Sequence, residues 1–487
     1  MTDTLAPVKP GKLVINGEAV DAVSGKTFTT WNPATEEPIC EVAEAGAEDV
    51  DRAVKAARAA FESGPWPRMK PAERQRILWK LGDLVLEHAD ELARLETLDN
   101  GKPITESRQA DIPMVAGCFH YYSGWVTKLT GDTVPVNPAL FTYTLREPLG
   151  VVGAIIPWNF PMIMVGWKCA PALAAGNTVV LKPAEATPLT AIRIGELALA
   201  AGLPPGALNI VPGPGRVAGE ALVRHPQVDK ISFTGSTEVG KHLMRLAADG
   251  VKKLTLELGG KSPNIVFADA DPEAALRGAT SGIYYGKGEV CAAGSRLLVE
   301  RSIHDEFVAK LAERAKKLVP GDPLDPKTRL GALVNETQMK TVLGYVETGV
   351  KEGAKLLAGG QRQPVNGKGW FVQATVLDQV ENRMRVAQEE IFGPVLAVIA
   401  FDDVDDAVRK ANDILYGLAA GVWTKDVKKA HSVARRLQAG TVWVNTYNLY
   451  DPGMPFGGYK SSGFGRDLGA ESMREYTQLK SVWMSIE

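Results

Sequence analysis

Residues 151–183, VVGAIIPWNFPMIMVGWKCAPALAAGNTVVLKP, contain the repeating unit that decides the fold. An apolar run, VVGAIIP, precedes a predicted helix from about Met162 to Ala175, and a second apolar run, TVVLKP, follows it. Continuous β-branched runs that alternate with helices are typical of parallel strands covered on both faces. The stretch therefore predicts an α/β protein built on a parallel sheet.

The same alternation continues towards the C-terminus. Helices are predicted at 188–200, at 216–225 and from Glu238, and strands at 207–213 and 229–235.

A second αβ series follows Gly260. It begins with a helix at Asp271 and Pro272, because the aspartate can cap the first free amides and proline suits the first turn. Its other predicted helices are at 304–318, 336–353, 405–413 and 428–437, and its predicted strands are at 296–300, 371–377, 394–400, 417–424 and 441–445. The chain is thus predicted to contain two α/β domains.

Two further regions complete the predicted organisation. Segments 49–61 and 71–98 carry apolar residues at helical spacing and form an amino-terminal helical layer. Segment 131–147 alternates like a hairpin, and the carboxy-terminal SMREYTQLKSVW reads as a helix end followed by a strand. Unpaired strand edges of this kind predict oligomerisation.

Composition excludes several classes of function. The chain has 487 residues, of which 45% are hydrophobic and 23% are charged, with a net charge of −2, as is ordinary for a globular protein of two or three domains. The near-neutral charge argues against a nucleic-acid partner. No stretch approaches the roughly 18 apolar residues of a membrane span, and the amino terminus lacks a secretory pattern, so we expect a cytoplasmic protein without a membrane partner.

The four cysteines lie far apart, at Cys40, Cys118, Cys169 and Cys291. This spacing argues against a disulfide framework and against a cysteine-based metal site, and we predict no metal. Cys118 and Cys169 fall in apolar helices and fit simple packing. Cys291 lies in a glycine-rich loop, GKGEVCAAGSR, whose small residues would let a carbonyl group approach the sulfur.

Polar segments after the predicted strands are the first places to look for a ligand site. Gly235 to Gly240 follows a strand and opens a helix, which fits either a phosphate site or a plain turn capped by Ser236. Glu185 is positioned to bind ribose hydroxyls and favours NAD, whereas the nearby Lys182 could accept the 2′-phosphate of NADP.

Five motifs in order along nearly the whole chain resemble the aldehyde dehydrogenase superfamily. They are PWNFP (157–161), LELGGK (256–261), the Cys291 loop, EEIFGPV (389–395) and PFGGYK (455–460). The resemblance implies a Rossmann-like cofactor domain, an α/β catalytic domain and a small β oligomerisation element. The corresponding residue ranges are 1–130 with 148–260, 261–460, and 131–147 with 474–487, respectively.

The resemblance also implies a mechanism. Cys291 would attack the aldehyde, and the Asn159 amide would hold the oxyanion of the thiohemiacetal. Hydride transfer to NAD would leave a thioester, and Glu257 would activate the water that hydrolyses it to the carboxylic acid. Lys168 and Asp467 match positions of a proton relay, although such residues are commonly only ion-paired.

For the cofactor and the aldehyde, the resemblance implies two further groups of residues. The cofactor group is Trp158, Lys182, Glu185, Gly235, Ser236, Glu390 and Phe392. The group at the aldehyde entrance is Met114, Phe160, Trp167, Tyr450 and Phe456, together with Tyr447, Leu449, Met162 and Met164, of which the last two are better explained as core. Aromatic lining would suit an aliphatic, aromatic or amino-aldehyde.

Other readings remain open beside this one. A coenzyme-A-acylating relative would pass the acyl group to a thiol, whereas Glu257 favours water. A catalytically silent binding or structural relative would be expected to lack the nucleophile or the oxyanion donor. A cysteine hydrolase needs a histidine base, and no histidine falls in a motif. The family resemblance also implies a homodimer or homotetramer.

Overall fold

The computed structural model describes residues 8–487, so part of the amino-terminal stretch considered above lies outside the described residues. Its largest sheet has eight strands in the order β2-β1-β8-β7-β6-β9-β10-β20. The strands are β1 (Leu13–Ile15), β2 (Glu18–Val20), β6 (Val151–Ile155), β7 (Thr178–Lys182), β8 (Leu208–Ile210), β9 (Lys230–Thr234), β10 (Lys253–Glu257) and β20 (Gly463–Phe464). The run β8-β7-β6-β9-β10 is parallel, and its strand order reverses between β6 and β9. Such a reversal is where α/β sheets bind ligands.

Helices pack around this sheet and connect its strands. They are α1 (Ala47–Glu62), α2 (Pro71–Glu87), α3 (Ala89–Asn100), α4 (Ile104–Glu106), α5 (Ile112–Ser123), α6 (Pro161–Ala174), α7 (Leu189–Ala201), α8 (Glu220–Arg224) and α9 (Thr237–Ala248). The single helix expected at 71–98 is wrong, because His88 (φ −96°, ψ 22°) leaves the helical region and separates α2 from α3. The helix expected at 216–225 begins as a π-helix, η3 (Gly215–Gly219).

A second sheet has the order β13-β14-β15-β12-β11-β17-β18. Its strands are β11 (Pro263–Val266), β12 (Arg296–Glu300), β13 (Lys355–Ala358), β14 (Thr375–Asp378), β15 (Val395–Phe401), β17 (Ala419–Trp423) and β18 (Thr441–Val444). Every neighbouring pair is parallel except β13 with β14. The strand expected at 371–377 is shorter than predicted. The predicted α/β architecture is confirmed.

The helices of this second unit are α10 (Pro272–Tyr284), α11 (His304–Lys317), α12 (Glu336–Lys351), α13 (Arg385–Gln388), α14 (Val404–Asn412) and α15 (Val427–Arg436). The Asp271 side chain caps α10 by accepting a hydrogen bond from the Ala274 amide, as the sequence predicted.

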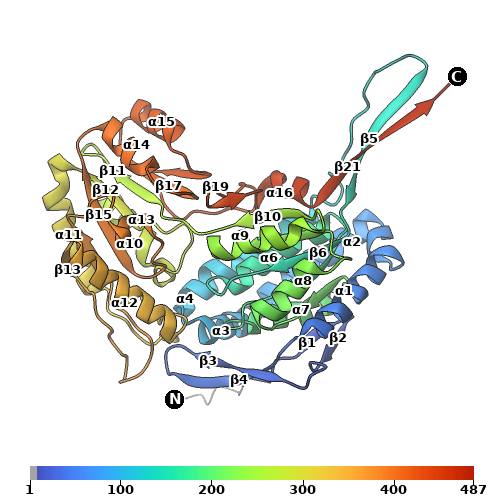
Figure 1. Ribbon diagram of the computed structural model, residues 1–487, viewed down its shortest axis with the longest axis horizontal. Coiled ribbons are helices and arrows are strands. Elements are labelled where there is room, and N and C mark those ends of the chain that lie inside the picture. Colours follow the sequence, from blue (N-terminus) through green and yellow to red (C-terminus); the bar gives the residue numbers. More distant parts are fainter. Residues whose placement is uncertain (1–7) are drawn as a thin grey trace.

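Three β pairs lie outside the large sheets in the described residues, and the smallest joins β16 (Tyr416–Gly417) to β19 (Tyr459–Lys460). The amino-terminal pair, β3 (Thr27–Asn32) with β4 (Glu37–Ala43), was not predicted. The third pair is antiparallel β5 (Leu140–Pro148) with β21 (Thr477–Ser485), which projects from the body as an arm (Figure 1). The hairpin expected over 131–147 is wrong in part, because only its second half forms a strand, within β5. Its first half is a loop that pairs with β5 at one isolated β-bridge, between Thr133 and Tyr143. Helix α16 (Gly469–Glu475) precedes β21, as expected.

One helix lies entirely inside the hydrophobic core. Helix α6, between β6 and β7, is buried along its whole length, which explains its continuous apolar sequence. Within residues 8–487, no helix combines the length and the apolar character needed to cross a bilayer.

Candidate active site

The site forms where the two large sheets face each other. Asn159 follows β6, Ser236 follows β9 and Glu257 ends β10, so all three lie at the carboxyl edge of the first sheet. Cys291 lies just before β12, and Phe392 lies just before β15, at the amino edge of the second sheet. One sheet therefore supplies groups from strand ends, and the other supplies them from strand beginnings.

The loop that carries Cys291 is shaped by three consecutive residues in the left-handed region, Gly286 (φ 56°), Lys287 (φ 63°) and Gly288 (φ 73°). A side chain at Gly288 would overlap the Gly393 backbone, so glycine is required there. The turn leaves Cys291 half-buried at the wall of a cavity of about 460 Å³. Burial, followed by the carboxylates of Glu257 and Glu390, raises the pKa of the Cys291 thiol well above its ordinary value. The resting sulfur is therefore a thiol.

Glu257 is buried at the end of β10. Within the described chain, neither of its carboxylate oxygens has a hydrogen-bond partner that meets ordinary geometry, although the Cys291 thiol is near enough to lower its pKa. Burial is the largest influence and raises the pKa of Glu257 to about 8, against the opposing charge of Lys168. A carboxyl group with this pKa can exchange protons near neutral pH.

Lys168 and Asp467 form a buried ion pair beside this site. The Lys168 ammonium donates to the Asp467 carboxylate over 2.6 Å, and both groups influence the pKa of Glu257. The two residues are thus brought together as expected, and their role as a relay stays a prediction.

The Asn159 side chain is held by the nucleophile loop. Its Nδ2 donates to the backbone oxygen of Glu289 over 2.9 Å, which engages one of its two amide hydrogens. Sequence reasoning missed the residue behind it, Asn100, whose Nδ2 donates to the Trp158 oxygen over 2.8 Å and to the Asn159 oxygen over 3.3 Å. Asn100 precedes a glycine at the end of α3, so its sequence signal is that of a helix end.

The predicted adenosine end of the cofactor site contains a buried ammonium. Lys182 ends β7, and burial lowers its pKa to about 8 against the opposing influence of Glu185, which is itself exposed. The hydrogen bond found for its Nζ within residues 8–487 goes to the Pro183 oxygen over 2.8 Å, so donors remain for a ligand. Ser236 caps α9 by accepting from the Val239 amide, at a helix start suited to phosphate. The Gly235 amide donates a hydrogen bond to the backbone oxygen of Glu257, which holds this turn against the end of β10. These features fit a dinucleotide.

The predicted nicotinamide end lies nearer to Cys291. Glu390 accepts a hydrogen bond from the Gly260 amide over 2.9 Å, and burial raises its pKa to about 7. Its carboxylate occupies the space that a side chain at Gly259 would need. Phe392, held in the left-handed region, packs edge-on against Trp158 with ring centroids 5.2 Å apart. Glu390 is near enough to Cys291 to raise the pKa of its thiol, and the cofactor roles of Glu390, Phe392 and Trp158 stay predictions.

All five predicted tunnel residues line the 460 Å³ cavity. The full lining within the described residues is Gln109, Ala110, Pro113, Met114, Gly117, Phe160, Ile163, Met164, Trp167, Tyr285, Val290, Cys291, Asn448, Leu449, Tyr450, Pro452 and Phe456. The lining contains no aspartate, glutamate, lysine, arginine or histidine.

Three of these rings form an aromatic cluster. Trp167, Tyr450 and Phe456 contact one another with centroids 5.4–5.9 Å apart. The expectation for Tyr447 is wrong: it packs under the nucleophile loop and donates to the backbone oxygen of Ala292, because its ring fills the space beside Gly421. Met164 belongs to the hydrophobic core, as expected, and also lines the cavity.

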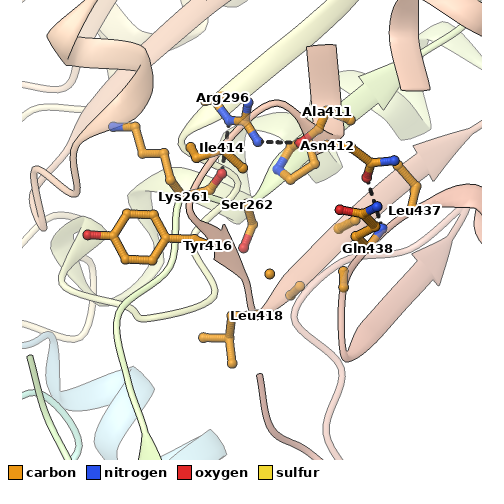
Figure 2. Close-up of a pocket in the computed structure, with 15 residues that line it drawn as sticks. Lys261, Ser262, Arg296, Ala411, Asn412, Ile414, Tyr416, Leu418, Leu437 and Gln438 are labelled. Atoms are coloured by element: carbon orange, nitrogen blue, oxygen red, sulfur yellow. Dashed lines mark hydrogen bonds between the residues drawn. The ribbon is translucent and has the colours of Figure 1, made fainter. Parts of the chain in front are cut away.

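A separate pocket behind Gly260 is structural. Figure 2 shows Arg296 reaching from β12 to the Lys261 oxygen (2.9 Å) and to the Ala411 oxygen (2.8 Å). The space between these residues is only about 10 Å³, roughly one water molecule. Arg296 therefore clamps the segment after Glu257 to the second sheet and leaves no room for a substrate.

Comparisons with known proteins agree with this geometry. The aldehyde dehydrogenase family model matches residues 20–482. The human mitochondrial aldehyde dehydrogenase is 51% identical over 477 residues, covering 98% of this chain and 92% of the human protein. An NAD+ complex of an aldehyde dehydrogenase from Bacillus cereus has a TM-score of 0.97 at 50% identity and covers 98% of this chain and 97% of that chain. The P. syringae indole-3-acetaldehyde dehydrogenase AldA, a cysteine-to-alanine mutant in complex with NAD+ and IAA, has a TM-score of 0.96 at 49% identity with the same coverage.

Proposed function

This chain belongs to the aldehyde dehydrogenase family, and from that premise we propose which of its residues perform the oxidation. The reaction converts an aldehyde to its carboxylic acid and reduces NAD. One observation carries the assignment of residues: the Cys291 thiol lines an apolar cavity beside a buried carboxyl group, Glu257, whose oxygens are free of other partners.

The first half of the reaction uses Cys291, Glu257 and Asn159. Glu257 takes the thiol proton, and the sulfur then adds to the aldehyde carbon to give a thiohemiacetal. The Asn159 Nδ2 hydrogen that does not bind Glu289 and the Cys291 backbone amide stabilise the oxyanion. When bound, NAD supplies the nicotinamide ring that accepts the hydride. Loss of that hydride from the thiohemiacetal carbon leaves a thioester on Cys291.

The second half of the reaction is hydrolysis. Glu257 first releases the thiol proton to solvent, and its carboxylate then removes a proton from water as the water oxygen adds to the thioester carbon. The carbon–sulfur bond breaks, the carboxylic acid leaves, and the sulfur takes the proton from Glu257 to regenerate the thiol. The free oxygens of Glu257 support transfer to water over transfer to coenzyme A. The presence of both Cys291 and Asn159 in the chain argues against a catalytically silent relative.

The cofactor residues are assigned by position. Lys182 and Glu185 bind the adenosine ribose, Ser236 and the start of α9 bind phosphate, and Glu390 binds the nicotinamide ribose. Phe392, Trp158 and Gly235 line the same cleft. We keep Lys168 and Asp467 as the predicted proton relay.

We propose that the substrate is an uncharged, apolar aldehyde, either aryl or long aliphatic. The cavity supports this because its walls are aromatic and aliphatic and offer no charged partner to a carboxylate or an ammonium group. The AldA relative, named for indole-3-acetaldehyde, is consistent with a bulky aromatic substrate.

We propose two domains, an oligomerisation arm and a cytoplasmic location for this chain. The two large sheets support a cofactor unit at 1–130 with 148–260 and a catalytic unit at 261–460. The β5–β21 arm supports an oligomerisation element at 131–147 with 474–487 and a homodimer or homotetramer. A cytoplasmic location is a prediction from the sequence.

The test is NADH production by the purified protein with aryl, aliphatic, ω-amino and carboxylate-bearing aldehydes. We expect the highest kcat/KM with aryl or long aliphatic aldehydes. Cys291→Ala should abolish turnover, whereas Cys40→Ala, at a free half-buried cysteine in β4, should leave it unchanged. Turnover by Cys291→Ala would contradict the mechanism, and a preference for charged aldehydes would contradict the substrate class alone.

A further inference from the structure

A buried lysine, Lys287, anchors the backbone around Asn159. Its ammonium donates to the backbone oxygen of Asn100 over 2.8 Å and to the side-chain Oδ1 of the same residue over 2.7 Å. It also pairs with Glu289 Oε2 over 2.7 Å. The two contacts with Asn100 are hydrogen bonds, whereas the contact with Glu289 Oε2 is an ion pair that lacks hydrogen-bond geometry.

The backbone at Lys287 makes this arrangement costly. Lysine is a non-glycine residue held at φ 63° between two glycines that are also left-handed. Such a conformation is unfavourable for a residue with a Cβ and persists only where surrounding contacts enforce it. A solvated lysine would gain nothing from this position, whereas here the turn brings the ammonium to Asn100.

The lysine fixes which way the Asn100 amide faces. Because Oδ1 accepts from the ammonium, Nδ2 must face the opposite side, where it donates to the Trp158 and Asn159 carbonyl oxygens. Lys287 thus determines the hydrogen bonds that hold the segment bearing Asn159.

Glu289 connects Lys287 to the side chain of Asn159. Its side chain pairs with Lys287 and also accepts from the Val334 amide over 3.0 Å, which fixes the residue in place. Its backbone oxygen accepts from Asn159 Nδ2 over 2.9 Å. The closed path Lys287–Asn100–Asn159–Glu289 therefore constrains both the backbone and the amide plane of Asn159.

We propose that Lys287, acting through Asn100 and Glu289, is a positioning residue for the oxyanion donor Asn159. The proposal rests on the proposed function, in which the second Nδ2 hydrogen binds the oxyanion. Donors of this kind must be held within about 0.5 Å of the productive geometry to stabilise a transition state. The ion pair Lys287–Glu289 supplies that restraint from inside the nucleophile loop itself.

The test removes the ammonium without leaving a buried charge. The double variant Lys287→Met, Glu289→Gln deletes all three donors, keeps an acceptor for Val334 and keeps the backbone oxygen that binds Asn159. We expect kcat to fall about tenfold or more, with the aldehyde KM within about twofold and the melting temperature near that of the parent. The matched control is Lys410→Met with Asp406→Asn, which removes another little-exposed ion pair, in α14, and should retain parental kcat.

A double-mutant cycle separates positioning from a merely structural role. Asn159→Ala alone should lower kcat by roughly 100-fold, the size expected for one oxyanion donor. In that background the Lys287→Met, Glu289→Gln change should cost less than about twofold, because the donor it positions is absent. Parental activity of Asn159→Ala would overturn the proposed function. Multiplicative losses, or full activity of the double variant alone, would overturn the role of Lys287.

A second variant covers a failure of the first to fold. Asn100→Asp still accepts from Lys287 but loses both donors to the Trp158 and Asn159 carbonyl oxygens. We expect a similar loss of kcat that again disappears in the Asn159→Ala background. Unchanged kcat in Asn100→Asp would overturn the proposal.

Discussion

Glu257 keeps two buried carboxylate oxygens without hydrogen-bond partners inside the described chain. Leaving a buried polar group unpaired costs on the order of 1–3 kcal/mol, so such a group is rare unless a ligand or substrate satisfies it. The same burial raises the pKa of Glu257 to about 8. The cost is explained if the carboxylate must remain free to take protons from the thiol and from water.

Replacing Glu257 by glutamine tests its role in hydrolysis. Glu257→Gln keeps the shape of the side chain but cannot accept a proton from water. We expect one equivalent of NADH to form and turnover then to fall by about 100-fold or more, because the thioester accumulates. Rapid-mixing absorbance separates the burst from the steady state. A parental steady-state rate would argue against Glu257 as the base.

The pH profile tests the ion pair beside it. A carboxyl group with a raised pKa is protonated below that pKa, so deacylation should rise with pH through about 8. The Lys168 charge lowers the pKa of Glu257, and Lys168→Met should therefore move the profile to higher pH. Lys168→Arg keeps the charge and serves as the control. A profile that stays in place or moves to lower pH in Lys168→Met would contradict this electrostatic role.

At the scale of residues, the sequence was informative where chemistry and local pattern coincide. Cys291 could be identified because small residues surround it within a few positions. Asn100 and Lys287 could not, because their contact joins segments 187 residues apart and neither has a motif of its own. Only the fold shows that one orients the other.

At the scale of elements, the short pairing of β10 with β20 fixes the end of β10. Gly463 lies opposite Glu257, and its neighbour Ser462 accepts from the Leu258 amide over 3.0 Å. Gly463 has φ 109°, and a side chain there would overlap the Leu256 oxygen. The pairing can therefore form only with glycine at this position.

An alanine at Gly463 should displace β20 from β10. We expect Gly463→Ala to lower the free energy of unfolding by about 2 kcal/mol and to reduce kcat, because the end of β10 moves with it. Gly344→Ala is the control: this exposed glycine within α12 has open space around its Cα, and alanine should stabilise the helix by about 0.5–1 kcal/mol. Denaturant unfolding measures both. Equal stability of Gly463→Ala and the parent would contradict the constraint.

The sequence predicted most elements of the two large sheets, since long periodic segments signal their type strongly. It failed where tertiary contacts decide. The break at His88 carries no proline or glycine, so the periodic pattern runs through it. Strands β1 to β4 are short or exposed in part, and their pairing partners rather than their composition define them.

At the scale of the whole molecule, the β5–β21 arm extends away from both sheets (Figure 1). It exposes large apolar side chains, including Leu479 at 55% and Trp483 at 62% exposure. Apolar groups on a projecting strand pair are expected to be covered by another copy of the chain.

Two charged substitutions on the arm test the oligomer. We expect the parent to behave as a dimer or tetramer and Leu479→Glu with Trp483→Glu to shift it towards the monomer, because carboxylates would be buried at the contact. Val427→Glu, at an exposed residue of α15, should leave the mass unchanged. Light scattering after size exclusion measures all three. An unchanged oligomer in the arm variant would exclude the arm as the contact.

The protonated state of Cys291 also bears on how long each molecule survives. Peroxides and alkylating agents react with thiolates and only slowly with thiols. Burial and the two neighbouring carboxylates raise the pKa of this thiol, so we expect its conversion to sulfenic acid between turnovers to be slow. An enzyme that acts on reactive carbonyl compounds would stay active longer if its nucleophile becomes a thiolate only when Glu257 takes its proton.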